Sequence, residues 1–98
     1  MRVVIMPRAM AALRRMAQRW RATARIPEVF DEDIALALQR IASAPTSAPV
    51  ARRTSRRTIY RVPARKTKLH FYFVVDDALG VVKVLDVWSQ FRARPPKL

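Results

Sequence analysis

The 98-residue sequence has no cysteine, a single histidine at His70 and a single glycine at Gly80. Without cysteine, neither a disulfide framework nor a Cys-based zinc site can form, and one histidine cannot build a His-rich metal site. One glycine is also too few for the loops that cradle phosphates in Rossmann and P-loop folds. No apolar run approaches the roughly 20 residues that a membrane-spanning helix needs. We therefore expect no metal, no cofactor and no membrane association.

The chain has the length and composition of one domain. Its 98 residues, 51% of them hydrophobic, can bury one compact core, and the apolar fraction argues against intrinsic disorder. We expect residues 1–98 to form a single domain. The lack of cysteine and of a secretory signal favours a cytoplasmic protein.

Acidic residues are scarce: seven Asp and Glu stand against 20 Lys and Arg, which gives a formal net charge of +13. The cations concentrate in two segments without acids, 1–27 and 51–75, whereas four acids lie together between Glu28 and Asp33. Those four acids suit the start of a helix, where the macrodipole favours negative charge. A strong field of one sign indicates an anionic partner: nucleic acid, a ribosome, an anionic membrane or an acidic protein.

Hydrophobic periodicity predicts two helices in the first half of the chain. A short apolar strand over 2–6 comes first, and apolar residues then recur at helical spacing from Pro7 to about Ala24. A second helix begins at Pro27, and the short connection predicts an antiparallel helical hairpin. Residues 43–56 carry two prolines and several hydroxyl residues, which predicts a loop.

The period then changes to two, which predicts strands over 58–62, 68–75 and 81–89. The element order predicts an α+β fold with an N-terminal strand. The helical hairpin packs on one face of a mainly antiparallel sheet of three to four strands. On the less covered face we expect Arg61, His70 and Tyr72, with Lys83 joining them if its parity agrees. Both tryptophans, Trp20 and Trp88, are expected in the core.

Several segments in this order resemble one protein family: Ile5–Ala9, Leu13–Ala17, Leu38–Pro45, Tyr72 with Val75–Asp77, Val81–Val84, Val87–Trp88, and the tail residues Arg92 and Arg94. Over nearly its whole length the chain resembles the RelE/ParE toxin superfamily of type II toxin–antitoxin modules. The resemblance implies a toxin that inhibits bacterial growth until a cognate acidic antitoxin binds it. It leaves the target open, because RelE-like members cut messenger RNA on the ribosome and ParE-like members bind DNA gyrase.

The residues bear on the choice of target. Ribosome-dependent cleavage needs a base, a cation on the phosphate and an acid, and the candidates for these roles are Arg61, His70 and Arg92. The set is incomplete, because Leu69 occupies a position that is basic in RelE-like toxins and Lys68 lies one residue out of step. After the last strand, Ser89–Phe91 replaces the usual basic residues or His and Tyr.

The incomplete set favours a ParE-like toxin without catalytic residues that binds DNA gyrase. Two alternatives stay open: a ribosome-dependent mRNA endonuclease, and a basic nucleic-acid-binding domain without toxicity. Contacts to the target or to the antitoxin are expected from residues of the middle strands and of the segment that ends the last strand: Arg61, Lys68, Tyr72, Trp88, Gln90, Phe91, Arg92 and Arg94.

Overall fold

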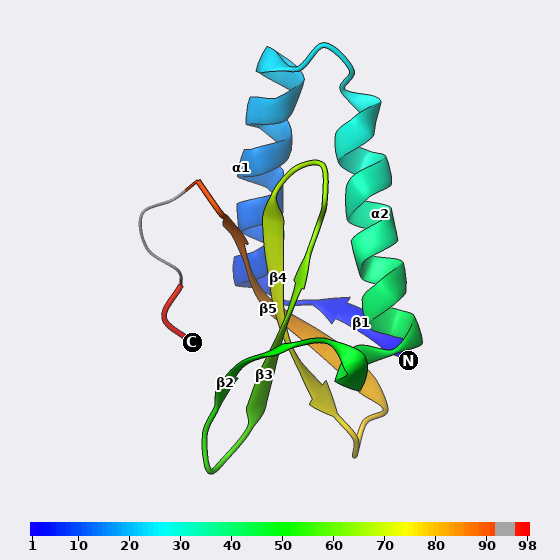
Figure 1. Cartoon of the computed structure of the whole chain (residues 1–98), viewed down its shortest axis with the longest axis vertical. Helices are drawn as coiled ribbons and strands as arrows, with labels where there is room; N and C mark the ends of the chain where they lie inside the picture. Colours follow the sequence, from blue (N-terminus) through cyan, green and yellow to red (C-terminus); the bar gives the residue numbers. More distant parts are fainter. Residues whose placement is uncertain (92–95) are drawn as a thin grey trace.

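The computed structural model describes residues 1–91 and 96–98. Its elements follow in the order β1 (Arg2–Ile5), α1 (Pro7–Thr23), α2 (Glu28–Ser43), a 3-10 turn η1 (Pro45–Ser47), β2 (Val50–Arg53), β3 (Thr58–Pro63), β4 (Leu69–Asp76) and β5 (Val81–Ser89). The two helices lie antiparallel to each other and cover one face of the sheet (Figure 1). The fold is α+β, as the sequence predicts.

The sheet contains five strands in the order β1-β5-β4-β3-β2. It is mixed, because β1 runs parallel to β5 while the other neighbours are antiparallel. The prediction of three to four strands is therefore wrong, and so is the prediction of a loop throughout 43–56. All four residues of β2 are exposed, so no alternation marks this strand. It forms because its backbone pairs with the edge of β3, where Arg53 lies opposite Thr58.

Both helices have identifiable starting points. Pro7 is the first residue of α1, where the missing N–H of a proline costs nothing. Glu28 and Asp31 lie in the first turn of α2, where the helix dipole favours carboxylates. Within the described ranges 1–91 and 96–98, neither helix has the length and apolar character that a membrane crossing requires.

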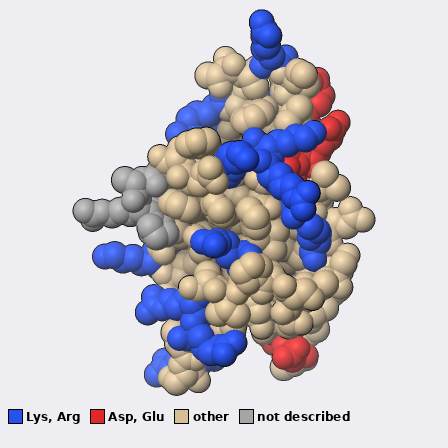
Figure 2. All heavy atoms as spheres, in the orientation of Figure 1, with Lys and Arg blue, Asp and Glu red and all other residues tan. Residues whose placement is uncertain are grey.

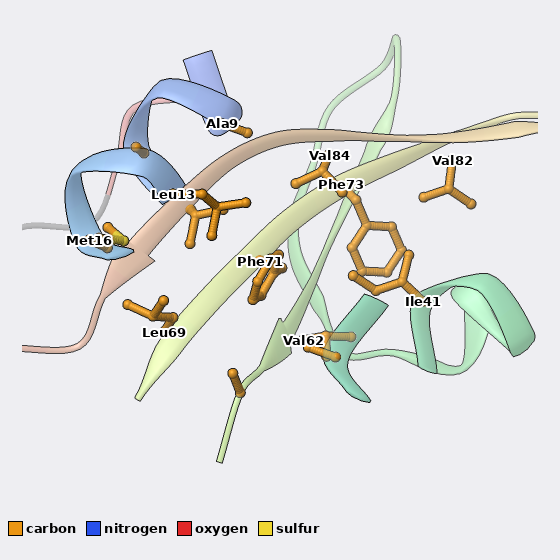
Figure 3. Close-up of a cluster of buried hydrophobic side chains, with 14 of the residues drawn as sticks. Ala9, Leu13, Met16, Ile41, Val62, Leu69, Phe71, Phe73, Val82 and Val84 are labelled. Carbon is orange, nitrogen blue, oxygen red and sulfur yellow. The ribbon is translucent and has the colours of Figure 1, made fainter. Parts of the chain in front are cut away.

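The hydrophobic core lies between the helical layer and the sheet (Figure 3). Phe71 and Phe73 of β4 are fully buried there, and Figure 3 shows Leu13 and Met16 of α1 and Ile41 of α2 directed toward this region. Small residues on the buried helix faces, such as the fully buried Ala9 and Ala37, allow the helices to approach the sheet closely. Trp20 packs against this core, as predicted.

Candidate functional site

The sheet face away from the helices collects the residues that the alternation predicts there. Arg61 lies opposite Tyr72, and His70 lies opposite Trp88. Residues that are opposite each other on neighbouring strands share a face. Lys83, opposite Val74, shares the face as well. We call this surface the open face.

His70 and Trp88 form a close pair on the open face. Their ring centroids are 5.4 Å apart with an interplanar angle of 36°. Trp88 is half-buried and is not part of the core cluster, so the prediction that Trp88 belongs to the core is wrong. His70 Nδ1 and Trp88 Nε1 are buried and have no hydrogen-bond partner among the described residues. Burial and then the charge of Arg61 lower the pKa of His70, against a smaller upward effect of Gln90. The imidazole is therefore neutral at pH 7.

Two other polar residues of the open face, Tyr72 and Asp86, are not free to bind a ligand: the first is buried, and the second is bonded to other residues of the chain. Tyr72 is only 5% exposed. It shares a small hollow of about 210 Å³ with residues of the chain end, Pro96 and Leu98. Asp86, opposite Tyr72, accepts a hydrogen bond from the Val87 N–H at 2.8 Å and forms an ion pair with Arg8 at 3.1 Å. The open face therefore presents neither a free phenol nor a free carboxylate at these positions.

Lys68 belongs to the β3–β4 turn and not to a strand, because β4 begins at Leu69. The prediction of a strand from residue 68 is wrong by this residue, and strand parity does not place its side chain. Lys68 has a backbone φ of 61°, a left-handed conformation that disfavours residues with a Cβ. Its carbonyl accepts the backbone N–H of Gln90 at 3.0 Å. The turn is thus tied to the chain that leaves β5.

The same turn is held from the other side by Asp33 of α2. Asp33 Oδ2 accepts hydrogen bonds from the Lys66 N–H at 3.1 Å, the Thr67 N–H at 2.8 Å and the Thr67 hydroxyl at 2.8 Å. Burial raises the pKa of Asp33, but the hydrogen bonds from Thr67 and Lys66 outweigh burial, so the pKa lies below its ordinary value. The carboxylate is therefore an anchor for the basic turn.

The sequence reasoning missed this anchor. Asp33 is 4% exposed, so assigning all four acids to the helix start is wrong for this residue, although it holds for Glu28 and Asp31. A signal was available in the spacing. Asp33 comes three residues after Phe30 and four before Ala37, on the apolar stripe of the helix. An acid on such a stripe requires a buried hydrogen-bonding partner.

A groove of about 480 Å³ runs between the two helices. Leu13, Ile34 and Leu38 contribute apolar side chains to it, and the charged residues of its lining, all exposed, are Arg14, Arg21 and Asp31. None of these residues is among the predicted contact residues. The groove therefore adds to the candidate sites an apolar surface that is lined by two cations and one acid.

The charged side chains are unevenly distributed over the surface. Figure 2 shows cations over the β2–β3 hairpin and near the β3–β4 turn, with acids near the start of α2 and at the β4–β5 turn. Among the described residues, the ion pairs are Arg8 with Asp86 and Lys83 with Asp76. Most of the arginines thus face solvent without an acidic partner within residues 1–91.

The remaining predicted contact residues follow β5. Gln90 and Phe91 are exposed, Phe91 to 79%, whereas Arg92 and Arg94 lie outside the described residues. Over the part of the chain that the structure describes, no three His, Asp or Glu side chains are grouped to hold a metal ion. Comparison of the chain with protein-family models, with curated proteins and with solved structures finds no match.

Proposed function

We propose that the chain is the toxin of a type II toxin–antitoxin module, and that it inhibits bacterial growth until an acidic antitoxin binds it. It acts as a ParE-like toxin, by protein–protein contact with its target, DNA gyrase. The order of one strand, two helices and an antiparallel meander agrees with what the resemblance to the RelE/ParE superfamily implies. The observation that carries the proposal is the groove between α1 and α2.

An amphipathic acidic helix fits this groove. Leu13, Ile34 and Leu38 offer an apolar surface to its nonpolar side, and Arg14 and Arg21 offer cations to its acidic side. On a chain of net charge +13, an acidic segment both covers apolar surface and reduces self-repulsion. These properties support the proposal of a toxin that an acidic antitoxin binds.

The open face supports contact over cleavage. A general base must reach the proton that it removes; the half-buried His70 has its Nδ1 covered and packs its ring against Trp88. Tyr72 is covered, whereas Arg61 is an exposed cation of this face. Among the described residues, Arg61 has neither a free phenol at Tyr72 nor a free carboxylate at Asp86 beside it, which favours contact over cleavage.

The test is induction of the chain alone in a bacterial host, with growth, gyrase-linked DNA breaks and transcript integrity followed together. We expect growth arrest with DNA breaks and intact transcripts, and we expect Arg61→Ala to leave the arrest unchanged. Phe91→Ala, at an exposed position after β5, is expected to relieve the arrest. Leu79→Ala, at another exposed large apolar residue in the β4–β5 turn, serves as its control.

Two outcomes would contradict the proposal. Codon-phased transcript cuts that disappear in Arg61→Ala would establish an mRNA endonuclease instead. Normal growth at high expression would remove the toxin function and favour a basic nucleic-acid-binding domain.

A further inference from the structure

The β2–β3 hairpin carries the densest group of cations in the chain: Arg52, Arg53, Arg56 and Arg57. It extends beyond the helical layer, at the lower left of Figure 1, and every residue from Val50 to Arg57 is exposed. None of the four arginines forms an ion pair with a described acid. Arg52 donates a hydrogen bond to the Leu98 carbonyl oxygen at 2.7 Å. The hairpin is thus a projecting cationic element whose charges are not neutralised by residues 1–91.

The tip of the hairpin is closed by Thr54. The Thr54 hydroxyl accepts the N–H groups of Arg56 at 3.3 Å and Arg57 at 3.1 Å, and the Thr54 N–H donates to the Arg57 carbonyl at 2.9 Å. These bonds fix the backbone that carries the two arginines of the tip. A binding element that is already ordered loses less conformational entropy when it meets its ligand.

The arginines lie on both faces of the hairpin as well as at its tip. Arg52 lies opposite Ile59 and Arg53 opposite Thr58, and consecutive strand residues point to opposite faces. A flat partner would meet the cations of one face only. A groove with anions on both walls would meet the cations of both faces and of the tip together.

We propose that the β2–β3 hairpin enters the major groove of duplex DNA and that its arginines contact phosphates along both walls. The major groove of B-form DNA is about 12 Å wide and admits a two-stranded ribbon. The major groove of A-form RNA is too narrow for such a ribbon. The proposal rests on the residues of the hairpin alone, and it stands or falls separately from the toxin function.

The test compares two variants of equal charge in titrations of a labelled duplex by fluorescence anisotropy. R53Q/R56Q/R57Q removes three cations from the hairpin, and R15Q/R19Q/R25Q removes three exposed cations from α1 and the segment that follows it. Both leave the formal net charge three below +13. Each phosphate contact contributes about 0.9 to the slope of log affinity against log salt, so the hairpin variant loses a slope of about 2.7.

This loss of slope is the expected result, and it is large enough to measure. When salt rises from about 50 to 200 mM, both proteins lose affinity for a duplex of about 20 base pairs. The factor lost by the parent should be about 40 times the factor lost by the hairpin variant. The control variant should keep the parent slope. Equal changes in the two variants would overturn the proposal, because they would show that total charge alone binds DNA.

Two further measurements keep the proposal testable if the triple variant folds poorly. Thr54→Val keeps every charge but removes the hydroxyl that closes the tip, and it should weaken duplex binding several-fold. Ser55→Ala is the control and should leave binding unchanged. Unchanged binding in Thr54→Val would contradict the role of the tip.

Competition experiments with the parent chain identify the class of ligand. Unlabelled duplex DNA should displace the labelled duplex more effectively than double-stranded RNA or polyglutamate does. Equal displacement by either of these competitors would overturn the assignment to a DNA groove.

Discussion

The two basic turns at the ends of β3 are built in opposite ways. The β3–β4 turn, with Arg65, Lys66 and Lys68, is tied to α2 by the buried carboxylate of Asp33. Among the described residues, the β2–β3 turn is closed by its own Thr54, and it extends into solvent. A run of cations therefore does not define a role by itself. A run that a carboxylate of the protein holds stabilises the fold, whereas a run without such a carboxylate is available to bind an anionic partner.

The largest effect on stability is expected from removing the anchor of the β3–β4 turn. Asp33→Ala leaves two N–H groups and a hydroxyl without their charged acceptor, which should lower the free energy of unfolding by about 3 kcal/mol. Urea unfolding measures this loss. Glu32→Ala, at the exposed neighbouring acid, is the control and should change the value by less than about 0.5 kcal/mol. Equal losses in the two variants would show that Asp33 is no anchor.

The anchor also predicts a dependence of stability on pH. The folded-state pKa of Asp33 is below its ordinary value of 3.8, so the folded state binds fewer protons at acidic pH than the unfolded state. The stability from Asp33 is complete above that ordinary value and is lost as the pH falls through the lower folded-state pKa. The difference in urea midpoint between the parent and Asp33→Asn should therefore shrink in acid. A difference that is constant from neutral to acidic pH would contradict this linkage.

A smaller effect is expected at Lys68, whose φ of 61° is left-handed. Lys68→Gly should raise the free energy of unfolding by about 0.5 to 1 kcal/mol, because glycine adopts this conformation without steric cost. Lys68→Val should lower it by about 1 kcal/mol, because a β-branched residue resists positive φ. Thermal unfolding of the two variants should shift the midpoint in opposite directions. Shifts of the same sign would mean that the lysine charge, and not its backbone, matters at this turn.

Sequence patterns gave most of the fold because they are local. The helical stripe from Pro7 and the alternation of β4 and β5 each lie within one segment, and the open-face residues follow from that alternation. Three features depend on tertiary context, and their local patterns do not name the partner or the backbone conformation. They are the pairing of β2 with β3, the left-handed backbone of Lys68 and the contact of Asp33 with the turn. Trp88 was misplaced because an aromatic residue suits either face of a sheet covered on one side only.

The smallest effect on stability is expected in the other basic turn. The side chains of Arg53, Arg56 and Arg57 are exposed and have no ion-pair partner among residues 1–91. R53Q/R56Q/R57Q should therefore change the free energy of unfolding by less than about 0.5 kcal/mol. A slight gain is consistent with reduced repulsion among like charges. A loss comparable to that of Asp33→Ala would show that this turn is also structural.

The difference between the two turns is tested most directly by measuring unfolding in urea and duplex DNA binding on the same two proteins, Asp33→Asn and R53Q/R56Q/R57Q. Asp33→Asn should lose about 1 to 2 kcal/mol of stability and bind DNA with the affinity of the parent. The hairpin variant should keep its stability and lose the steep dependence of DNA binding on salt. Loss of both properties in either protein would contradict the separation of an anchored structural turn from a free binding turn.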